Sequence, residues 1–173
     1  MSSARVVGDG DPSPTIEING QTYDAADVVE RLGRHMTDRR KRRIREVVEA
    51  RTRSIVPVVE GLYDMGNVSA VLRSAEALGC CSAHVIETSE HFMHSSRTSG
   101  GAEKWIDLHR WDAPGACHDQ LKANGYTIVA THLDASVPLD NIDFTEPTAV
   151  IFGNEKDGVS DTTLEYADYR CRI

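Results

Sequence analysis

The run Thr148-Ala149-Val150-Ile151-Phe152 leads directly into a loop bracketed by glycines, Gly153-Asn154-Glu155-Lys156-Asp157-Gly158. Short apolar runs of this kind are typical of strands that are covered on both faces of a sheet. Glycines let the backbone approach a ligand closely, so Glu155 is a candidate site residue. The alternative is a tight turn with a solvated glutamate. The stretch therefore predicts a buried strand that ends at a candidate site.

Around this strand, the chain alternates between apolar runs and helical patterns. Strands are predicted over 55–59, 83–86, 106–108, 126–130, 148–152 and 170–173, and helices over 67–78, 113–124 and 160–167. Such alternation indicates an α/β fold, a mostly parallel sheet with helices on both faces, in which ligands bind at the carboxyl ends of the strands. Pro57 suggests an edge or early position for the first of these strands.

The 173 residues predict one domain with a terminal extension. Residues 1–23 are expected to be a mobile N-terminal extension, in which Asn19-Gly20 could form the turn of a small hairpin. Residues 24–53 are expected to form a basic helical segment with helices over 25–35 and 38–52. Residues 54–173 then form the α/β core.

Charge is unevenly distributed along the chain. The net charge is −8, yet residues 31–53 hold ten of the 19 Lys and Arg residues and only three acidic residues, a local net charge of +7. Such asymmetry suggests a polyanionic partner. A solvated helix face is the alternative, although like charges at helical spacing lower the stability of a helix.

Several functional classes are disfavoured by absent patterns. No apolar run is long enough to span a membrane, the N-terminus lacks a signal-peptide core, and the four cysteines show no disulfide spacing, which favours a reducing cytoplasm. No G-x-G-x-x-G follows a strand, and Val159-Ser160 replaces the Lys-Ser/Thr of a P-loop. His91 and His94 lack a third ligand nearby, so no metal is expected.

A second stretch, residues 66–79, carries a helical pattern with polar residues at chosen positions. Its apolar residues form one stripe, Asn67 precedes the predicted helix and could cap it, and Arg73 lies off the stripe. An arginine on the polar face near a strand-to-helix turn is well placed to hold a phosphate. An ordinary amphipathic helix with a capped start explains the apolar residues equally well.

Together, the two stretches resemble motifs one and two of the SpoU branch of the SPOUT RNA methyltransferases, N-x-[GS]-A-[IV]-[IL]-R and [IL]-x-G-x-E-x-x-G-[IV]. The resemblance extends over residues 38–173 and includes Ala130-Thr131-His132-Leu133-Asp134. The basic helix, the Thr-His-Leu segment and the lead-in 143–147 are most similar to the branch that methylates guanosine-18 of tRNA. The resemblance implies a fold with a trefoil knot, S-adenosylmethionine as cofactor, tRNA as partner and a homodimer.

The resemblance also implies roles for individual residues. Arg73 would activate or position the ribose 2′-hydroxyl, and Asn67 and Glu155 would hold and orient it. A guanidinium, with a general pKa above ~12, is a poor base, which favours phosphate binding and alkoxide stabilisation by Arg73. The expected cofactor-binding residues are Thr131, His132, Leu133, Ile151, Phe152 and Gly153, and the expected RNA-binding residues are Arg39, Arg40, Lys41, Arg42 and Arg43.

The sequence departs from the family pattern at two places. Gly66 stands where some relatives have a histidine, and the family's third motif, which completes the knot and much of the cofactor pocket, would begin after Ile173. The chain as given is therefore expected to form an incomplete site. Two alternatives remain: a methyltransferase that acts on ribosomal RNA, and a noncatalytic RNA-binding protein of the same fold, which the missing motif favours.

Overall fold

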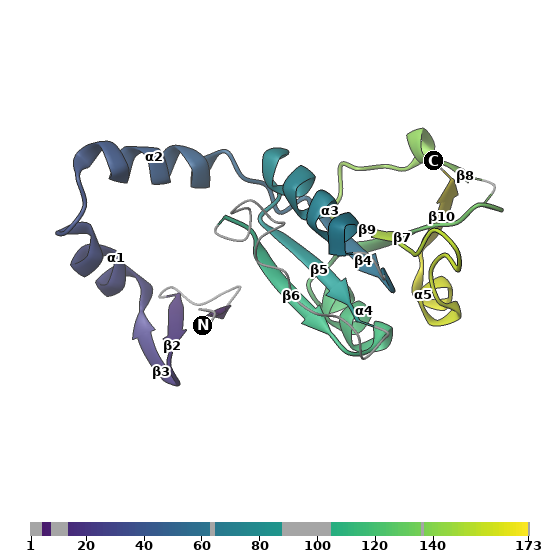
Figure 1. Cartoon of the computed structure of the whole chain (residues 1–173), viewed down its shortest axis with the longest axis horizontal. Helices are drawn as coiled ribbons and strands as arrows, with labels where there is room; N and C mark the ends of the chain where they lie inside the picture. Colours follow the sequence, from purple (N-terminus) through teal and green to yellow (C-terminus); the bar gives the residue numbers. More distant parts are fainter. Residues whose placement is uncertain (1–4, 8–13, 63–64, 88–104, 136, 173) are drawn as a thin grey trace. The chain divides into compact units, whose positions relative to one another are not determined.

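The computed structural model describes residues 5–7, 14–62, 65–87, 105–135 and 137–172. The chain divides into two compact units, Met1–Ala50 and Arg51–Ile173 (Figure 1). The division lies close to the boundary expected between residues 53 and 54. It assigns Arg51 and Arg53, which belong to the basic stretch of the sequence, to the larger unit.

The smaller unit contains an antiparallel sheet followed by two helices. Its elements are β1 (Arg5–Val7), β2 (Thr15–Ile18), β3 (Gln21–Asp24), α1 (Ala25–Gly33) and α2 (Asp38–Glu49). The β2–β3 hairpin turns at Asn19 and Gly20, which both have positive φ, as a two-residue type I′ turn requires. Where the sequence predicts a mobile extension over residues 1–23, the structure has three paired strands within the described residues.

The larger unit is built on a seven-stranded parallel sheet in the order β6-β5-β4-β9-β7-β10-β8. The strands are β4 (Ile55–Glu60), β5 (Ser82–Ile86), β6 (Asp107–Trp111), β7 (Thr127–Thr131), β8 (Val137–Pro138), β9 (Thr148–Phe152) and β10 (Tyr169–Arg172). The helices are α3 (Met65–Ala77), α4 (Pro114–Ala123), α5 (Asp161–Tyr166) and the 3-10 turn η2 (Leu139–Asn141). The expected α/β class is confirmed.

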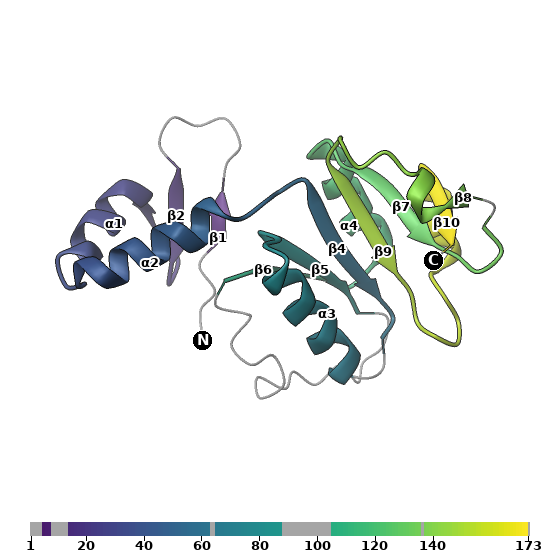
Figure 2. The same cartoon turned by 90° about the horizontal axis from the view of Figure 1, so that it is seen from above.

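Helices cover both faces of this sheet, as Figure 2 shows for α3 and α4. Successive side chains of a strand point to opposite faces. In β4, Val58 accordingly packs in the core beneath α4 and α5, and Val59 packs in the core beneath α3. Because these strands are buried on both faces, they read as continuous apolar runs rather than as an alternating pattern.

Pro57 lies in the middle of the sheet, and the prediction of an edge strand is wrong. It pairs in register with Val150 of β9, while β5 flanks β4 on the other side. The missing N–H of one proline costs one ladder hydrogen bond, about 1 kcal/mol. Burial of a single neighbouring valine stabilises the fold by about 1.5 kcal/mol or more, so the position is tolerated.

The order of the strands reverses between β4 and β9. From β4 the chain proceeds outward through β5 to β6, and then crosses the sheet through α4 to β7 on the other side. All strands are parallel, so their carboxyl ends lie along one edge. In open sheets of this type, ligands bind at this edge where the strand order reverses. The strand order therefore predicts a ligand site at the loops that follow β4 and β9.

Candidate active site

Asn67 and Glu155 meet at the point where the strand order reverses. Asn67 follows β4 and Glu155 follows β9, and the Asn67 Nδ2 donates a hydrogen bond of 2.5 Å to the Glu155 Oε1. The prediction that Asn67 caps its helix is wrong, because α3 begins at Met65 and the Asn67 side chain binds Glu155 instead. The two motifs that are separated in sequence thus form one polar site.

The loop that carries Glu155 is tightly closed. Asn154 and Gly158 exchange two backbone hydrogen bonds of 2.9 and 2.8 Å, and the Asn154 Oδ1 accepts a bond of 2.7 Å from the Lys156 N–H. A Cβ on Gly153 would lie 2.1 Å from the carbonyl carbon of Gly158, a distance that no side chain tolerates. Close approach of the backbone therefore requires the first glycine, and φ of +71° favours a glycine at 158.

Arg73 lies further along α3 with an exposed side chain. It lies six positions after Asn67, about 9 Å further along the helix axis and about 120° around it. Within the part of the chain that the structure describes, its guanidinium has no hydrogen-bond or ion-pair partner. The opposite face of α3 packs against the sheet through Val68, Leu72 and Ala75. Arg73 is thus held by a rigid helix and is available to an external anion.

The expected cofactor-binding residues lie at the ends of the adjacent strands β7 and β9. The Thr131 Oγ1 donates a hydrogen bond of 3.0 Å to the Ile151 carbonyl oxygen, which joins the two segments. The Leu133 side chain is 94% exposed, whereas Ile151 is completely buried. Ile151, with its carbonyl oxygen bonded to Thr131, therefore offers no exposed group to a ligand, whereas Leu133 offers an apolar surface. His132, Phe152 and Gly153 are partly exposed beside them.

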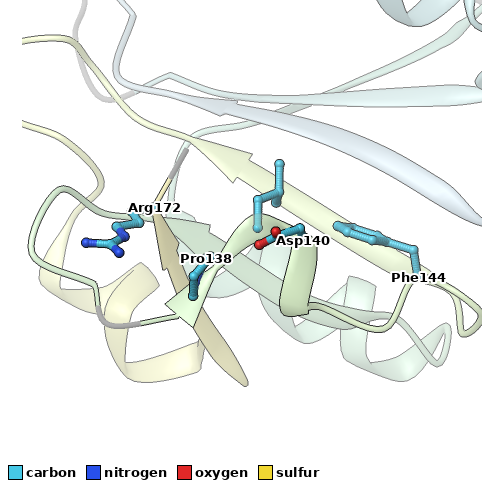
Figure 3. Close-up of a pocket in the computed structure, with 5 residues that line it drawn as sticks. Pro138, Asp140, Phe144 and Arg172 are labelled. Carbon is cyan, nitrogen blue, oxygen red and sulfur yellow. The ribbon is translucent and has the colours of Figure 1, made fainter.

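An open pocket of about 510 Å³ lies at the carboxyl ends of β8 and β10 (Figure 3). Its lining residues are Pro138, Leu139, Asp140, Phe144 and Arg172. None of the expected site residues lines it. It is therefore a separate hollow at the same edge of the sheet, and it does not correspond to the site that the sequence predicts.

The expected RNA-binding residues lie on α2, a helix without buried residues. Lys41 is 3.7 Å from Asp38 and Arg43 is 3.9 Å from Glu46, both at loose ion-pair distances on an exposed surface. Exposed pairs of this kind contribute little to stability. Within the described residues, the side chains of Arg39, Arg40 and Arg42 have no partner. Consecutive helical residues lie about 100° apart, so α2 presents exposed cations around its circumference.

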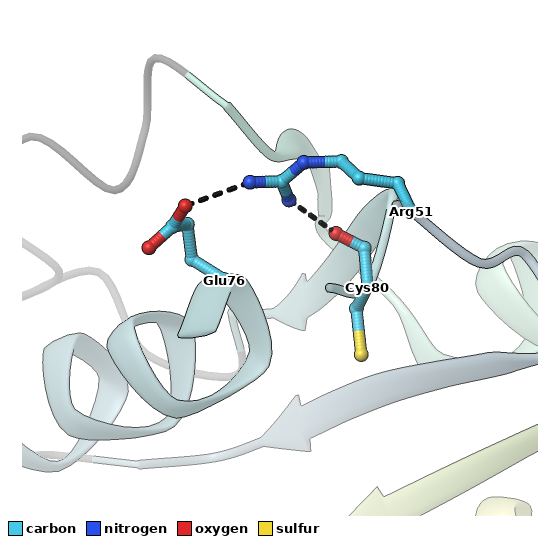
Figure 4. Close-up of polar contacts among 3 residues, drawn as sticks. All are labelled: Arg51, Glu76 and Cys80. Atoms are coloured by element: carbon cyan, nitrogen blue, oxygen red, sulfur yellow. Dashed lines mark hydrogen bonds and ion pairs between the residues drawn. The ribbon is translucent and has the colours of Figure 1, made fainter. Parts of the chain in front are cut away.

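Arg51 belongs to the same basic stretch but has a structural role in the larger unit. Its guanidinium donates hydrogen bonds of 2.7 Å to the Glu76 Oε1 and to the Cys80 carbonyl oxygen (Figure 4). The Arg51 side chain is only 8% exposed. It anchors the end of α3, and it is therefore unavailable to a polyanion. The sequence alone does not distinguish it from its exposed neighbours.

Two histidines are buried between the sheet and α4. The His84 Nδ1 accepts a hydrogen bond of 3.0 Å from the Trp111 Nε1, and the His118 Nε2 lies 2.6 Å from the Thr163 Oγ1. Burial, with smaller contributions from His109 and His118, lowers the pKa of His84 to about 3. Burial also lowers the pKa of His118. Both are neutral at physiological pH and belong to the core.

The remaining sequence predictions concern metal ligands, membrane-spanning helices and cysteines. His91 and His94 lie outside the described residues. Among the residues that the structure describes, no cluster of three His, Cys, Asp or Glu side chains could hold a metal ion. No described helix is long and apolar enough to cross a membrane. The four cysteines are free.

Comparison with known proteins places this geometry in a family. Residues 54–173 match the model of the SpoU rRNA Methylase family. A tRNA (guanosine(18)-2′-O)-methyltransferase from Borreliella burgdorferi is 34% identical over 151 residues, which cover 85% of this chain and 69% of the relative.

Solved structures agree with the family match. The Aquifex aeolicus TrmH/SpoU tRNA modifying enzyme superposes with a TM-score of 0.70 at 28% identity and covers 79% of this chain and 70% of its own. The SpoU methyltransferase AviRb from Streptomyces viridochromogenes, in complex with the cofactor AdoMet, has a TM-score of 0.61 at 26% identity, with 68% of this chain and 47% of its own covered. The match over the whole parallel-sheet unit confirms the resemblance carried by the two motifs, and the chain belongs to the SpoU methylase family.

Proposed function

We propose that this protein transfers a methyl group from S-adenosylmethionine to a ribose 2′-hydroxyl of tRNA, at guanosine-18 of the D-loop. The observation that carries the proposal is the Asn67–Glu155 hydrogen bond, which joins the two family motifs at the reversal of strand order. The relatives named as tRNA (guanosine(18)-2′-O)-methyltransferases support the choice of substrate. The relative solved with AdoMet supports the choice of cofactor.

The residues at the ends of β7 and β9 fit the proposed cofactor. S-adenosylmethionine combines an apolar-faced adenine with polar groups that need backbone partners, and Leu133 and the partly exposed backbone of Phe152 and Gly153 offer both kinds of contact. When bound, the cofactor supplies an electrophilic methyl group on a sulfonium. Thr131 supports this region by binding the Ile151 carbonyl oxygen, which keeps the two strand ends together.

Asn67 and Glu155 orient the ribose hydroxyl in this proposal. Their mutual bond uses one Glu155 oxygen and leaves the second one available to accept a hydrogen bond from the 2′-hydroxyl. Methyl transfer is an in-line displacement, so holding the hydroxyl in line with the methyl group supplies much of the rate. A fixed acceptor also excludes the hydroxyl orientations that cannot react.

Arg73 binds the phosphate beside the target ribose and stabilises the developing alkoxide. Its exposed guanidinium, without a partner in the described part of the chain, is suited to both roles. A guanidinium stays protonated at neutral pH and presents a planar fork that matches phosphate oxygens. The arginine therefore acts by electrostatic stabilisation rather than as a base.

The basic helix α2 supplies the affinity for tRNA. Arg39, Arg40, Lys41, Arg42 and Arg43 contact phosphates, since no buried contact in the helix competes for them. The protein acts as a homodimer in the cytoplasm, where tRNA and a reducing milieu that suits four free cysteines are found.

Methylation assays with the full gene product test the proposal. Unmodified tRNA transcripts should accept labelled methyl groups, and a transcript with 2′-deoxyguanosine at position 18 should not. Methylation of ribosomal RNA transcripts alone would establish the ribosomal alternative. RNA binding without any methyl transfer, with S-adenosylmethionine bound or not, would establish the noncatalytic alternative.

A further inference from the structure

Side-chain hydrogen bonds join the loop that carries Glu155 to the end of β4. The side chains involved are not among the residues that the two family motifs specify. The Asn154 Nδ2 donates a hydrogen bond of 3.1 Å to the Gly61 carbonyl oxygen, across 93 residues of sequence. A second and longer contact of 3.4 Å joins the Ser160 N–H to the Glu60 Oε2. Both contacts connect the segment after β9 with the end of β4, one at its last residue and one at the residue that follows it.

Asn154 is the centre of this connection. It is 8% exposed, and its Oδ1 accepts hydrogen bonds from the Lys156 and Asp157 N–H groups at 2.7 and 3.3 Å. One side chain thus closes the loop through its oxygen and fastens the loop to β4 through its nitrogen. The amide supplies a separate acceptor and donor for these two contacts, whereas an ionised carboxylate of the same shape supplies acceptors only.

Glu155 itself has much weaker support. Its side chain is exposed, and its one hydrogen bond within the described residues is the bond to Asn67. An exposed glutamate with free rotamers loses side-chain entropy when it is held in one orientation. The position of its backbone is set by the neighbouring Asn154, because residue 155 follows directly on the fastened residue.

We infer that Asn154 is a positioning residue for methyl transfer, which holds Glu155 in register with Asn67 by fastening the motif-two loop to the carbonyl oxygen of Gly61. This inference rests on the proposed function. Asn154 acts through Glu155, so its loss should lower kcat while leaving the affinity for RNA, supplied elsewhere, largely intact.

The test compares Asn154→Asp with Asn124→Asp. The aspartate at 154 keeps the oxygen that closes the loop but loses the donor toward Gly61. Asn124 is an exposed asparagine after α4, and it controls for the added charge. We expect Asn154→Asp to lower kcat by about tenfold with KM for tRNA changed less than about twofold. Asn124→Asp should leave both unchanged.

A second comparison isolates the path through Glu155. In a Glu155→Ala background, Asn154→Asp should cost less than about twofold in kcat, because coupled residues are non-additive. Equal costs in the two backgrounds would show a merely structural role and overturn the inference. Unchanged kcat in the single variant would overturn it as well.

Hydrogen exchange keeps the inference testable without turnover. The Gly158 N–H donates to the Asn154 backbone oxygen, which the substitution leaves in place, so its exchange reports on the loop as a whole. We expect Asn154→Asp to speed this exchange by about tenfold. Absence of methyl transfer by the wild-type protein on every RNA refutes the proposed function, whereas unchanged Gly158 exchange refutes the inference about Asn154.

Discussion

Two helices that carry arginines, α2 and α3, differ in what holds their charges in place. α2 has no buried residue and carries exposed arginines around its circumference. α3 buries Val68, Leu72 and Ala75 against the sheet and carries one exposed arginine, Arg73. Solvated cations adapt to the phosphates that they meet, whereas an arginine on a packed helix has a defined position. The first arrangement suits affinity, and the second suits chemistry.

Removal of the positive charges of α2 is expected to have the largest effect, which is on the affinity for tRNA. Replacing Arg39, Arg40, Arg42 and Arg43 with Ala should reduce the log–log salt slope of tRNA binding by about 0.7–0.9 for each lost phosphate contact. If all four contact phosphates, affinity falls about a thousandfold at about 0.1 M salt. Binding titrations over a range of salt concentrations measure the slope.

The control variant of α2 keeps the positive charge at each position and changes the shape of the side chain. The same four positions changed to Lys should retain most of the slope, since ammonium groups also release counterions. An unchanged slope in the alanine variant would show that α2 is a solvated surface, and it would remove the contrast between the helices. Affinity for S-adenosylmethionine should be unaffected in both variants.

The next effect concerns the single arginine of α3. Arg73→Ala should lower methyl transfer by at least about 100-fold, the scale of one positioned catalytic group. Its melting temperature and cofactor affinity should stay close to those of the parent, because exposed side chains change stability by no more than about 0.5 kcal/mol. Turnover, thermal melts and cofactor titration provide the three readouts.

The Arg73→Lys variant tests whether catalysis needs the guanidinium group or only a positive charge at this position. An ammonium cannot reproduce the planar fork of a guanidinium, so the lysine should rescue poorly. Near-normal turnover of Arg73→Ala would make this arginine equivalent to an ordinary surface residue. Unfolding of the alanine variant would assign Arg73 to the structure of α3.

A smaller effect separates two arginines of the basic stretch. Arg51→Ala should destabilise the larger unit by about 2 kcal/mol, less than the 3–5 kcal/mol typical of a broken buried ion pair, because Glu76 is 30% exposed. Arg53→Ala, at an exposed side chain, should change stability by no more than about 0.5 kcal/mol. Urea unfolding of both variants gives the comparison. Equal losses would contradict the buried role of Arg51.

The smallest expected effect is on the pH dependence of stability. His84, with its pKa lowered to about 3 by burial, stays neutral in the folded protein while the unfolded chain takes up a proton below about pH 6.5. The unfolded state then binds more protons, so stability falls as pH decreases from about 6.5 toward 3. Between about pH 7.5 and pH 5.5, the loss from this group is about 1 kcal/mol.

His84→Gln tests this assignment and keeps an acceptor for the Trp111 Nε1. Melting temperatures should depend less on pH in this variant, with a remainder from His118, whose pKa burial also lowers. His35→Gln, at an exposed histidine of the smaller unit, should retain the full dependence. Identical pH profiles for His84→Gln and the parent would exclude His84 as the source.

Local sequence patterns predicted most of the helices and strands. They did not predict the elements whose formation depends on contacts between residues far apart in the sequence. The hairpin at Asn19-Gly20 formed as its turn residues predict. β8 and η2 were not predicted, because such short segments have no measurable period. β8 exists through its pairing with β10, which the linear sequence does not display.

The linear sequence alone determined which segments are helices or strands and which family the protein resembles. Periodicity, turn residues and the two short motifs are local properties of the sequence. Tertiary structure alone determined which of the candidate site residues contact one another. It brought Asn67 to Glu155 across 88 residues instead of to its own helix end, and it took Arg51 out of the basic surface into a buried pair. It also added Asn154, whose donor finds the Gly61 oxygen only because β4 and β9 are neighbours. Pairing of parallel strands is non-local, so these contacts arise only when the sheet is assembled.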